Sequence, residues 1–170
     1  GTAANTEMQV GDILVLGGRA TRVTALANAT SLTIESAHLT GAAAATGTRR
    51  WEFFGEFDSA PGTSEYATNF GSTGDELHVI VVDEDGFFTG TAGTVLEKFP
   101  FVSKASDAKN SDGSSNYYKN VINTQSKYIW WMDHPTDMSD WGTTAAAAGA
   151  FVGLNSPSNV SLTSGVDAAP

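Results

Sequence analysis

The sequence predicts an α+β fold, in which a mixed β-sheet with a few short flanking helices follows a small all-β unit, either a hairpin or meander or a partial barrel. Three observations predict it. Short alternating runs separated by glycine and asparagine turns fill residues 10–37. The densest apolar run, residues 77–82, lies near the middle of the chain. Apolar residues spaced four apart predict a short helix over 114–124.

Size and charge limit the classes of function. The chain has 170 residues, enough for one medium domain or a medium domain with a small one. Its formal net charge is −10 and its only basic doublet is Arg49-Arg50. Because such a surface repels phosphate backbones and anionic lipids, we expect no direct nucleic-acid or membrane partner. The absence of cysteine excludes disulfides, cysteine-ligated zinc and thiol chemistry.

Residues 1–48 are predicted to form the small β unit and an Ala/Gly-rich linker. Gly17-Gly18 provides a tight turn. A phosphate-binding loop is excluded there, because no Gly-Lys-Ser/Thr sequence follows. The tract over 41–48 carries no packing side chains and is the expected linker. Three strands are expected, at residues 13–16, 21–26 and 32–35.

Residues 49–170 are predicted to form part of an α/β core domain with a loop-rich C-terminal stretch. Both faces of the 77–82 run are apolar, which indicates an interior strand covered on two sides. Ala145–Ala148 is expected to be extended, and 160–170 to be a strand and a turn. The other expected elements are strands at 51–57, 95–102 and 127–131 and helices at 64–70 and 114–124, with an N-cap at 113–115.

Asp83-Glu84-Asp85-Gly86 is the sharpest acidic cluster. A calcium loop needs an acidic residue six positions after the glycine, where this chain has Ala92. Asp-Gly between apolar runs is instead a hairpin signal. We therefore expect a hairpin, and no metal site.

The histidines and tryptophans leave two alternatives open. His38, His78 and His134 show no ligand-pair spacing, and His78 is expected to be half-buried and hydrogen-bonded. Asp133 and His134 with an unidentified serine would make a hydrolase, although no Gly-x-Ser-x-Gly elbow exists. Trp130 and Trp131, with Tyr128, would make a sugar-stacking platform, but neighbours on a strand face opposite ways, which favours core packing. We therefore expect no catalytic, cofactor-binding or metal-binding residues.

Several motifs of the second part occur in an order and spacing that resemble one family. They are Ala60-Pro61-Gly62-Thr63-Ser64, Asp75-Glu76-Leu77-His78-Val79, Asp83-Glu84-Asp85-Gly86, Gly93-Thr94-Val95-Leu96-Glu97, Asp112-Gly113-Ser114-Ser115-Asn116-Tyr117-Tyr118, and Asn120-Val121-Ile122-Asn123 with Ser126 to Trp130. Together they resemble the tail sheath protein of contractile-tailed, T4-like bacteriophages, including those of marine hosts. The resemblance covers residues 53–135. Residues 161–168 resemble the family's Leu-x-Gly-Gly-x-Asp-Gly segment, with departures at Ser164 and Ala168.

The resemblance implies a structural virion protein, not an enzyme. Family subunits are several times longer, so it implies an internal fragment of a subunit that is assembled in the host cytoplasm and located in the phage tail. Its implied partners are other sheath subunits and the tail tube protein, with terminal arms adding strands to neighbours. The sheath stacks helically around the tube and contracts for DNA delivery. Alone, without these arms, the fragment is expected to be monomeric.

Overall fold

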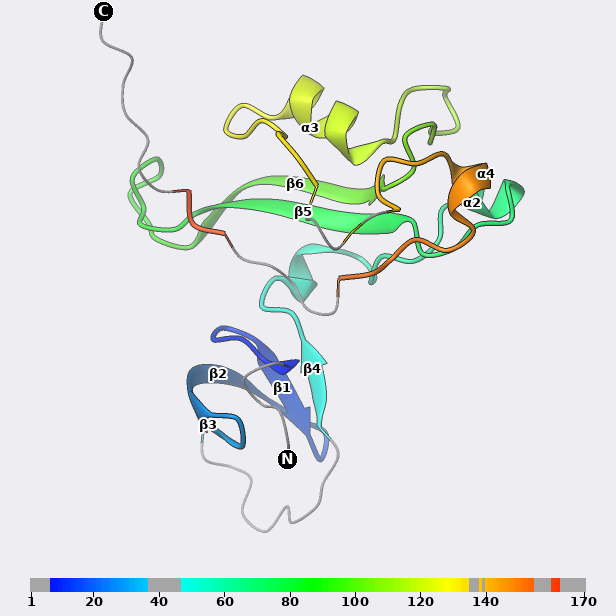
Figure 1. The fold of residues 1–170 in the computed structure, drawn as a ribbon. Coiled ribbons are helices and arrows are strands. Elements are labelled where there is room, and N and C mark those ends of the chain that lie inside the picture. The colour runs from blue at the N-terminus through cyan, green and yellow to red at the C-terminus, as the bar shows by residue number, and fades with distance from the viewer. Residues whose placement is uncertain (1–6, 37–46, 135–137, 139, 155–159, 163–170) are drawn as a thin grey trace, which may run out of the picture. The chain divides into compact units, whose positions relative to one another are not determined.

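The computed structural model describes residues 7–36, 47–134, 138, 140–154 and 160–162 (Figure 1). Two compact units are present, the first extending to Ala60 and the second running from Pro61 to Gly153. Each unit has its own antiparallel sheet, and short helices flank the second. The predicted α+β class is therefore confirmed.

The first unit is a four-stranded antiparallel sheet in the order β3-β2-β1-β4. The predicted strands are confirmed, and β1 and β2 meet at Gly17 and Gly18, whose φ angles of +54° and +77° suit a tight hairpin. The predicted boundary at residue 48 falls at the first residue of β4. The strands are β1 (Ile13–Leu16), β2 (Arg19–Asn28), β3 (Ser31–Ile34) and β4 (Thr48–Arg50).

A buried ion pair holds β4 in this sheet. Asp12 is 1% exposed, and its carboxylate accepts hydrogen bonds from Arg49 Nε at 2.6 Å and from the backbone N–H of Gln9 at 2.7 Å. These two donors offset part of the cost of burying the carboxylate, whereas Nη2 of Arg49 is buried without a hydrogen-bond partner among the described residues. The pair joins β4 to the residue just before β1, a long-range contact that local patterns do not reveal.

The predicted strand at 51–57 is wrong. This segment contains the short 3-10 helix η1 (Phe54–Glu56). The ring of Trp51 stacks on that of Phe57, with centroids 5.9 Å apart, and meets Phe53 edge-on at 5.4 Å. An extended chain would separate residues 51 and 57 by roughly 20 Å. The aromatic contacts therefore exclude the strand.

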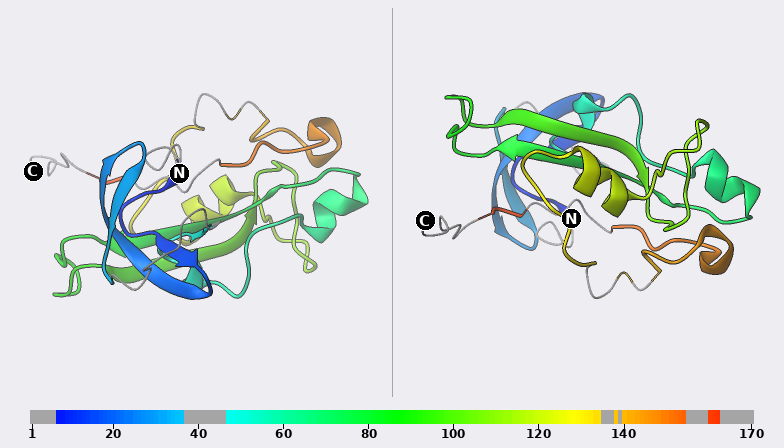
Figure 2. Two further views of the ribbon diagram at one scale, coloured as in Figure 1. Left: turned by 90° about the horizontal axis from the view of Figure 1, so that it is seen from below. Right: turned by 90° about the horizontal axis from the view of Figure 1, so that it is seen from above.

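The second unit is built on a long hairpin of β5 (Glu76–Asp83) and β6 (Thr94–Ser103). Figure 2 shows α3 (Tyr118–Gln125) lying across one face of this pair. The core beneath α3 is formed by the buried residues Leu77, Phe99, Val102, Tyr117, Tyr118, Val121, Ile122, Met138 and Trp141. The predicted strands at 77–82 and 95–102 and the helix near 114–124 are confirmed.

The prediction that β5 is covered on both faces is wrong for the described residues. Only Leu77 and Asp83 of this strand are buried, and the residues between them are half-buried. Val79 and Val81 pack against the α3 core, whereas His78 alternates with them. An apolar run on both faces thus did not require a second covering layer.

The predicted strand at 127–131 is also wrong, because side chains take its backbone donors. The Glu97 carboxylate accepts the N–H of Lys127, and the hydroxyl of Ser126 accepts those of Tyr128 and Ile129. The N-cap predicted at 113–115 is wrong too: Tyr117 precedes α3 and makes no side-chain cap bond. Ser114 is instead held in a turn by Asp112.

Two short helices lie at the end of the hairpin where β5 begins and β6 ends, opposite the β5–β6 loop (Figure 1). The helix predicted at 64–70 is confirmed as α2 (Glu65–Asn69), capped by the Ser64 hydroxyl, which accepts the N–H of Ala67 at 3.0 Å. Residues predicted to be extended form α4 (Ala145–Ala148). Alanine has the highest helix propensity, and the Asp107 carboxylate accepts the N–H of Ala145 at 2.8 Å. Residues 160–162 form no strand, and the rest of that predicted strand lies outside the described residues.

Candidate functional site

The β5–β6 pair is a two-stranded sheet with open edges. Among the described residues, β5 forms a ladder only with β6, and β6 has a further single bridge, between Ser103 and Tyr117. A two-stranded hairpin is marginal by itself, and unpaired strand edges present backbone groups to other chains. At one end these edges are occupied, because Glu76 N–H donates to the Gly62 carbonyl at 3.2 Å and Ser103 N–H to the Asn116 carbonyl at 2.8 Å. The remaining length of each edge is the backbone surface on which an added strand would pair.

The loop that joins these strands is organised by the buried carboxylate of Asp83. Asp83 is 2% exposed, and one of its oxygens accepts the N–H of Phe88 at 3.1 Å and both the N–H and hydroxyl of Thr89 at 2.8 Å. Burial raises the pKa of this carboxyl, but the hydrogen bonds from Thr89 and Phe88 outweigh it and lower the pKa below its ordinary value. The predicted hairpin is confirmed, with a longer loop than an Asp-Gly turn needs.

The same loop holds Phe87 and Phe88 in solvent, with 83% and 64% of each side chain exposed. Gly86 has φ +82°, and a Cβ there would lie 2.8 Å from the backbone nitrogen of Ala92. The N–H of Gly90 donates to the Gly86 carbonyl at 2.8 Å. The loop is thus closely packed on its backbone side and displays its largest apolar side chains outward.

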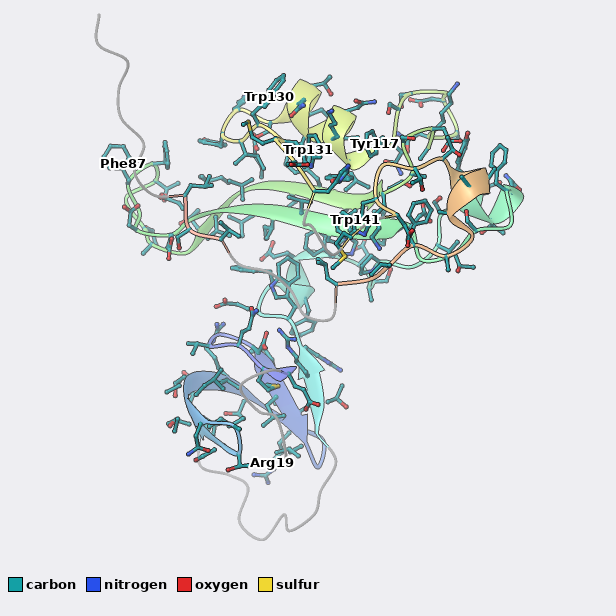
Figure 3. The ribbon with its side chains drawn as sticks, in the orientation of Figure 1. Arg19, Phe87, Tyr117, Trp130, Trp131 and Trp141 are labelled. Atoms are coloured by element: carbon teal, nitrogen blue, oxygen red, sulfur yellow. The ribbon has the colours of Figure 1, made fainter. Side chains whose placement is uncertain are left out.

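Aromatic rings continue from this loop to the segment that follows α3. Phe88 meets Phe87 edge-on at 5.5 Å and Tyr128 at 5.3 Å. We name these three residues the aromatic tip. Figure 3 shows Phe87 at the end of the hairpin, with Trp130 on the segment after α3. Phe87 and Phe88 gave no distinctive sequence signal apart from their place after a hairpin turn.

The two adjacent tryptophans differ. Trp131 packs against the core, donates from Nε1 to the Tyr118 hydroxyl at 2.9 Å and lies 4.4 Å below Lys119 Nζ. Trp130 is 68% exposed, so its predicted core packing is wrong. The side chains of Trp130 and Trp131 thus differ in environment, as expected for neighbours that face opposite ways, but only Trp131 is covered by the core.

His134 is enclosed by aromatic side chains. Its Nδ1 forms a hydrogen bond with the Tyr118 hydroxyl, and its Nε2 lies 3.5 Å from the Tyr117 hydroxyl. Burial lowers the pKa of His134, whereas it raises that of Tyr118. The Asp133 carboxylate accepts the backbone N–H of His134 at 2.8 Å. Within the described part of the chain, the ring nitrogens thus meet tyrosines, not the aspartate and serine of the hydrolase alternative.

The remaining predicted histidines take no part in this cluster. His78 is half-buried, as predicted, and its Nδ1 accepts the N–H of Phe101 at 3.0 Å. Phe101 has φ +51°, an unusual backbone conformation for a bulky residue. His38 lies outside the described residues.

Buried polar residues that the sequence did not reveal connect α2 to the hairpin. Asp75, which is fully buried, accepts the N–H and the hydroxyl of Ser64, each at 2.8 Å, and the Ser103 hydroxyl at 2.5 Å. Lys104 is 4% exposed, donates to the Gly74 carbonyl at 2.7 Å and lies 5.3 Å from the Trp141 ring centre. Burial lowers the pKa of Lys104, and the nearby Asp75 opposes this effect. These contacts are structural ties.

A groove of about 480 Å³ opens between α2 and the 109–116 loop. Its lining is mostly polar, with aromatic side chains from Tyr66 and Phe101. Glu65, Asn69 and Lys109 line it from two sides. A groove of this volume is in the range that small ligands occupy.

The described residues also bear on metal sites and membrane-spanning helices. In that part of the chain, no three histidine or acidic side chains cluster closely enough to hold a metal ion. No helix there is both long and apolar enough to span a bilayer. Comparison with protein-family models, with curated proteins and with solved structures found no match.

Proposed function

We propose that this chain is part of a tail sheath subunit of a contractile-tailed, T4-like bacteriophage. In this proposal it is a structural virion protein that polymerises helically around the tail tube with other sheath subunits and contracts for DNA delivery. The ordered motifs over residues 53–135 are its basis in the sequence. Its partners are other sheath subunits and the tube protein.

The open β5–β6 edges are the structural observation that supports this proposal. Assembly by strand addition requires a sheet edge that accepts a strand from another chain. The hairpin strands span 8 and 10 residues, long enough to pair with an incoming arm over several hydrogen bonds.

A second candidate is a virion-associated carbohydrate- or receptor-binding module. Two observations favour it: Trp130 is largely exposed, and the polar groove beside α2 includes the aromatic residues Tyr66 and Phe101. Aromatic faces and polar side chains together suit a sugar, which has both apolar and hydroxyl-bearing surfaces.

Immunogold labelling of phage particles separates the two candidates. Antibodies raised against this chain would be applied to intact particles of a contractile-tailed phage whose genome encodes it. Labelling along the whole tail is the result expected of a sheath subunit. Labelling confined to fibres or the baseplate would instead support the receptor-binding module, and unlabelled particles would overturn both.

A further inference from the structure

We propose that the aromatic tip docks onto the first unit of a second copy of this chain, beside Arg50 and Phe54. This inference rests on the proposed function, since it names a contact by which neighbouring subunits join. It concerns side chains at the end of the hairpin and is separate from strand addition at the sheet edges.

The tip has the character of a preformed anchor. Phe87 and Phe88 are more than half exposed, yet the loop beneath them is fixed by Asp83 and by the tight turn at Gly86. Aromatic side chains dominate the binding energy of interfaces when they enter a pocket of the partner. A loop that is already ordered loses little entropy on binding.

The size of the tip indicates what kind of association it supports. The exposed fractions are 83% for Phe87, 64% for Phe88 and 42% for Tyr128. With about 200 Å² per ring, the tip offers roughly 400 Å², half of the ~800 Å² per partner of a stable interface. One such contact is therefore too small for a stable dimer but adds to others in a repeating array.

A local charge match favours a second copy as the partner. The exposed acidic residues Glu84 and Asp85 precede the two phenylalanines of the tip, and the exposed Lys127 precedes Tyr128. All four arginines of the chain lie in the first unit and all five lysines in the second. In the first unit, Arg22 pairs with Glu52 and Arg49 with Asp12. The remaining two are Arg19 and Arg50, both exposed.

Arg50 offers the better match of the two. Its guanidinium lies 5.1 Å from the ring centre of Phe54, which is itself 43% exposed. A cation beside an exposed ring complements phenylalanines flanked by carboxylates. Because the tip and Arg50 are different surfaces, the contact is head-to-tail and propagates along an array. Between copies that each carry a net charge of −10, such a local attraction offsets the general repulsion.

Site-directed cross-linking tests this contact, and the chain has no cysteine of its own. Glu84→Cys leaves the phenylalanines in place, and Gly55→Cys lies beside Phe54 where a Cβ meets nothing within 4 Å. The two variants would be mixed and oxidised mildly. The matched control replaces Gly55→Cys by Thr30→Cys, at an exposed turn of the same unit.

We expect the Glu84→Cys and Gly55→Cys mixture to form heterodimer at least about fivefold faster than the control mixture. Adding Phe87→Ser and Phe88→Ser to the Glu84→Cys chain should reduce the rate to that of the control. Arg50→Glu in the Gly55→Cys chain should do the same. Circular dichroism of each variant checks that it is folded.

Equal rates for the two mixtures would overturn the proposed contact. A tip that binds a different protein would also give equal rates. That result together with immunogold labelling along the tail would leave the sheath proposal standing. Faster cross-linking without tail labelling would support the contact and reject the sheath proposal.

Discussion

The Asp83 carboxylate accepts both the backbone N–H and the hydroxyl of Thr89, each at 2.8 Å, across the loop between β5 and β6. A buried acceptor thereby fixes the backbone just after the two exposed phenylalanines. The order of the aromatic tip thus depends on a side chain that is hidden beneath it.

Replacing Asp83→Ala should loosen this loop without unfolding the hairpin. The amides of Phe88 and Thr89 lose their acceptor, so their hydrogen exchange should accelerate by about tenfold or more. Exchange measured by NMR checks this, with Asp85→Ala as the control, since Asp85 accepts only from Phe87 in this loop. Unchanged exchange at Thr89 would contradict the role of Asp83.

Asp75→Asn should destabilise the second unit by about 2–4 kcal/mol, because a buried acceptor of three hydrogen bonds gains a donor with no place in the network. Urea unfolding followed by tryptophan fluorescence measures this change. The exposed Glu84→Gln is the control, with an expected change within about 0.5 kcal/mol. A loss below about 1 kcal/mol for Asp75→Asn would show that the network is unimportant for stability.

Local features of the fold were predictable from the sequence, and those that depend on distant contacts were not. Gly17-Gly18 and the alternating runs beside it determine the β1–β2 hairpin within a few residues. The extent of β4 depends on Arg49 reaching Asp12, which is distant along the chain. The sequence pattern of the η1 segment predicts a strand, and only the stacking of Trp51 on Phe57 in the folded chain shows that it is not one.

The candidate site was predictable to a similar extent. Asp85-Gly86 indicated the hairpin, but nothing local indicated that Phe87 and Phe88 would be exposed. Trp130 and Trp131 form one apolar pair in the sequence, and only packing by Tyr118 and Lys119 distinguishes the covered ring from the exposed one. Exposure depends on which surfaces the rest of the chain covers, and hydropathy alone does not contain that information.

Acid should destabilise the second unit through His134. Burial lowers the folded-state pKa of this histidine below the 6.5 of an exposed one, so the unfolded chain binds the proton first. The contribution to stability is complete above pH 6.5 and is lost as the pH falls from 6.5 through the folded-state pKa. We would measure the free energy of unfolding in urea at several pH values between 7.5 and about 5. It should fall less steeply with decreasing pH in His134→Gln than in the unmodified chain. Identical slopes would contradict burial of the neutral ring.

Two glycines with nearly equal, positive φ angles allow the effect of a steric clash to be separated from that of backbone strain. Gly142 and Gly113 have φ angles of +85° and +84°. A Cβ at Gly142 would lie 2.7 Å from His134 Nε2 and 3.0 Å from the Tyr117 hydroxyl, whereas at Gly113 it meets nothing within 4 Å. Gly113→Ala should cost about 1–2 kcal/mol, the cost of a left-handed alanine. Gly142→Ala should cost about 1–3 kcal/mol more. Equal losses in urea unfolding would show that the His134 cluster yields to the added methyl.

The exposed phenylalanines should matter for association and hardly at all for folding. Phe87→Ser with Phe88→Ser should change the free energy of unfolding by less than about 1 kcal/mol, because both rings are already largely in water. Phe99→Ala, at a position 5% exposed in the α3 core, should cost about 3–5 kcal/mol. Thermal and urea unfolding compare the two. A large loss in the double serine variant would mean that these rings stabilise the fold, and their exposure would then no longer argue for a docking surface.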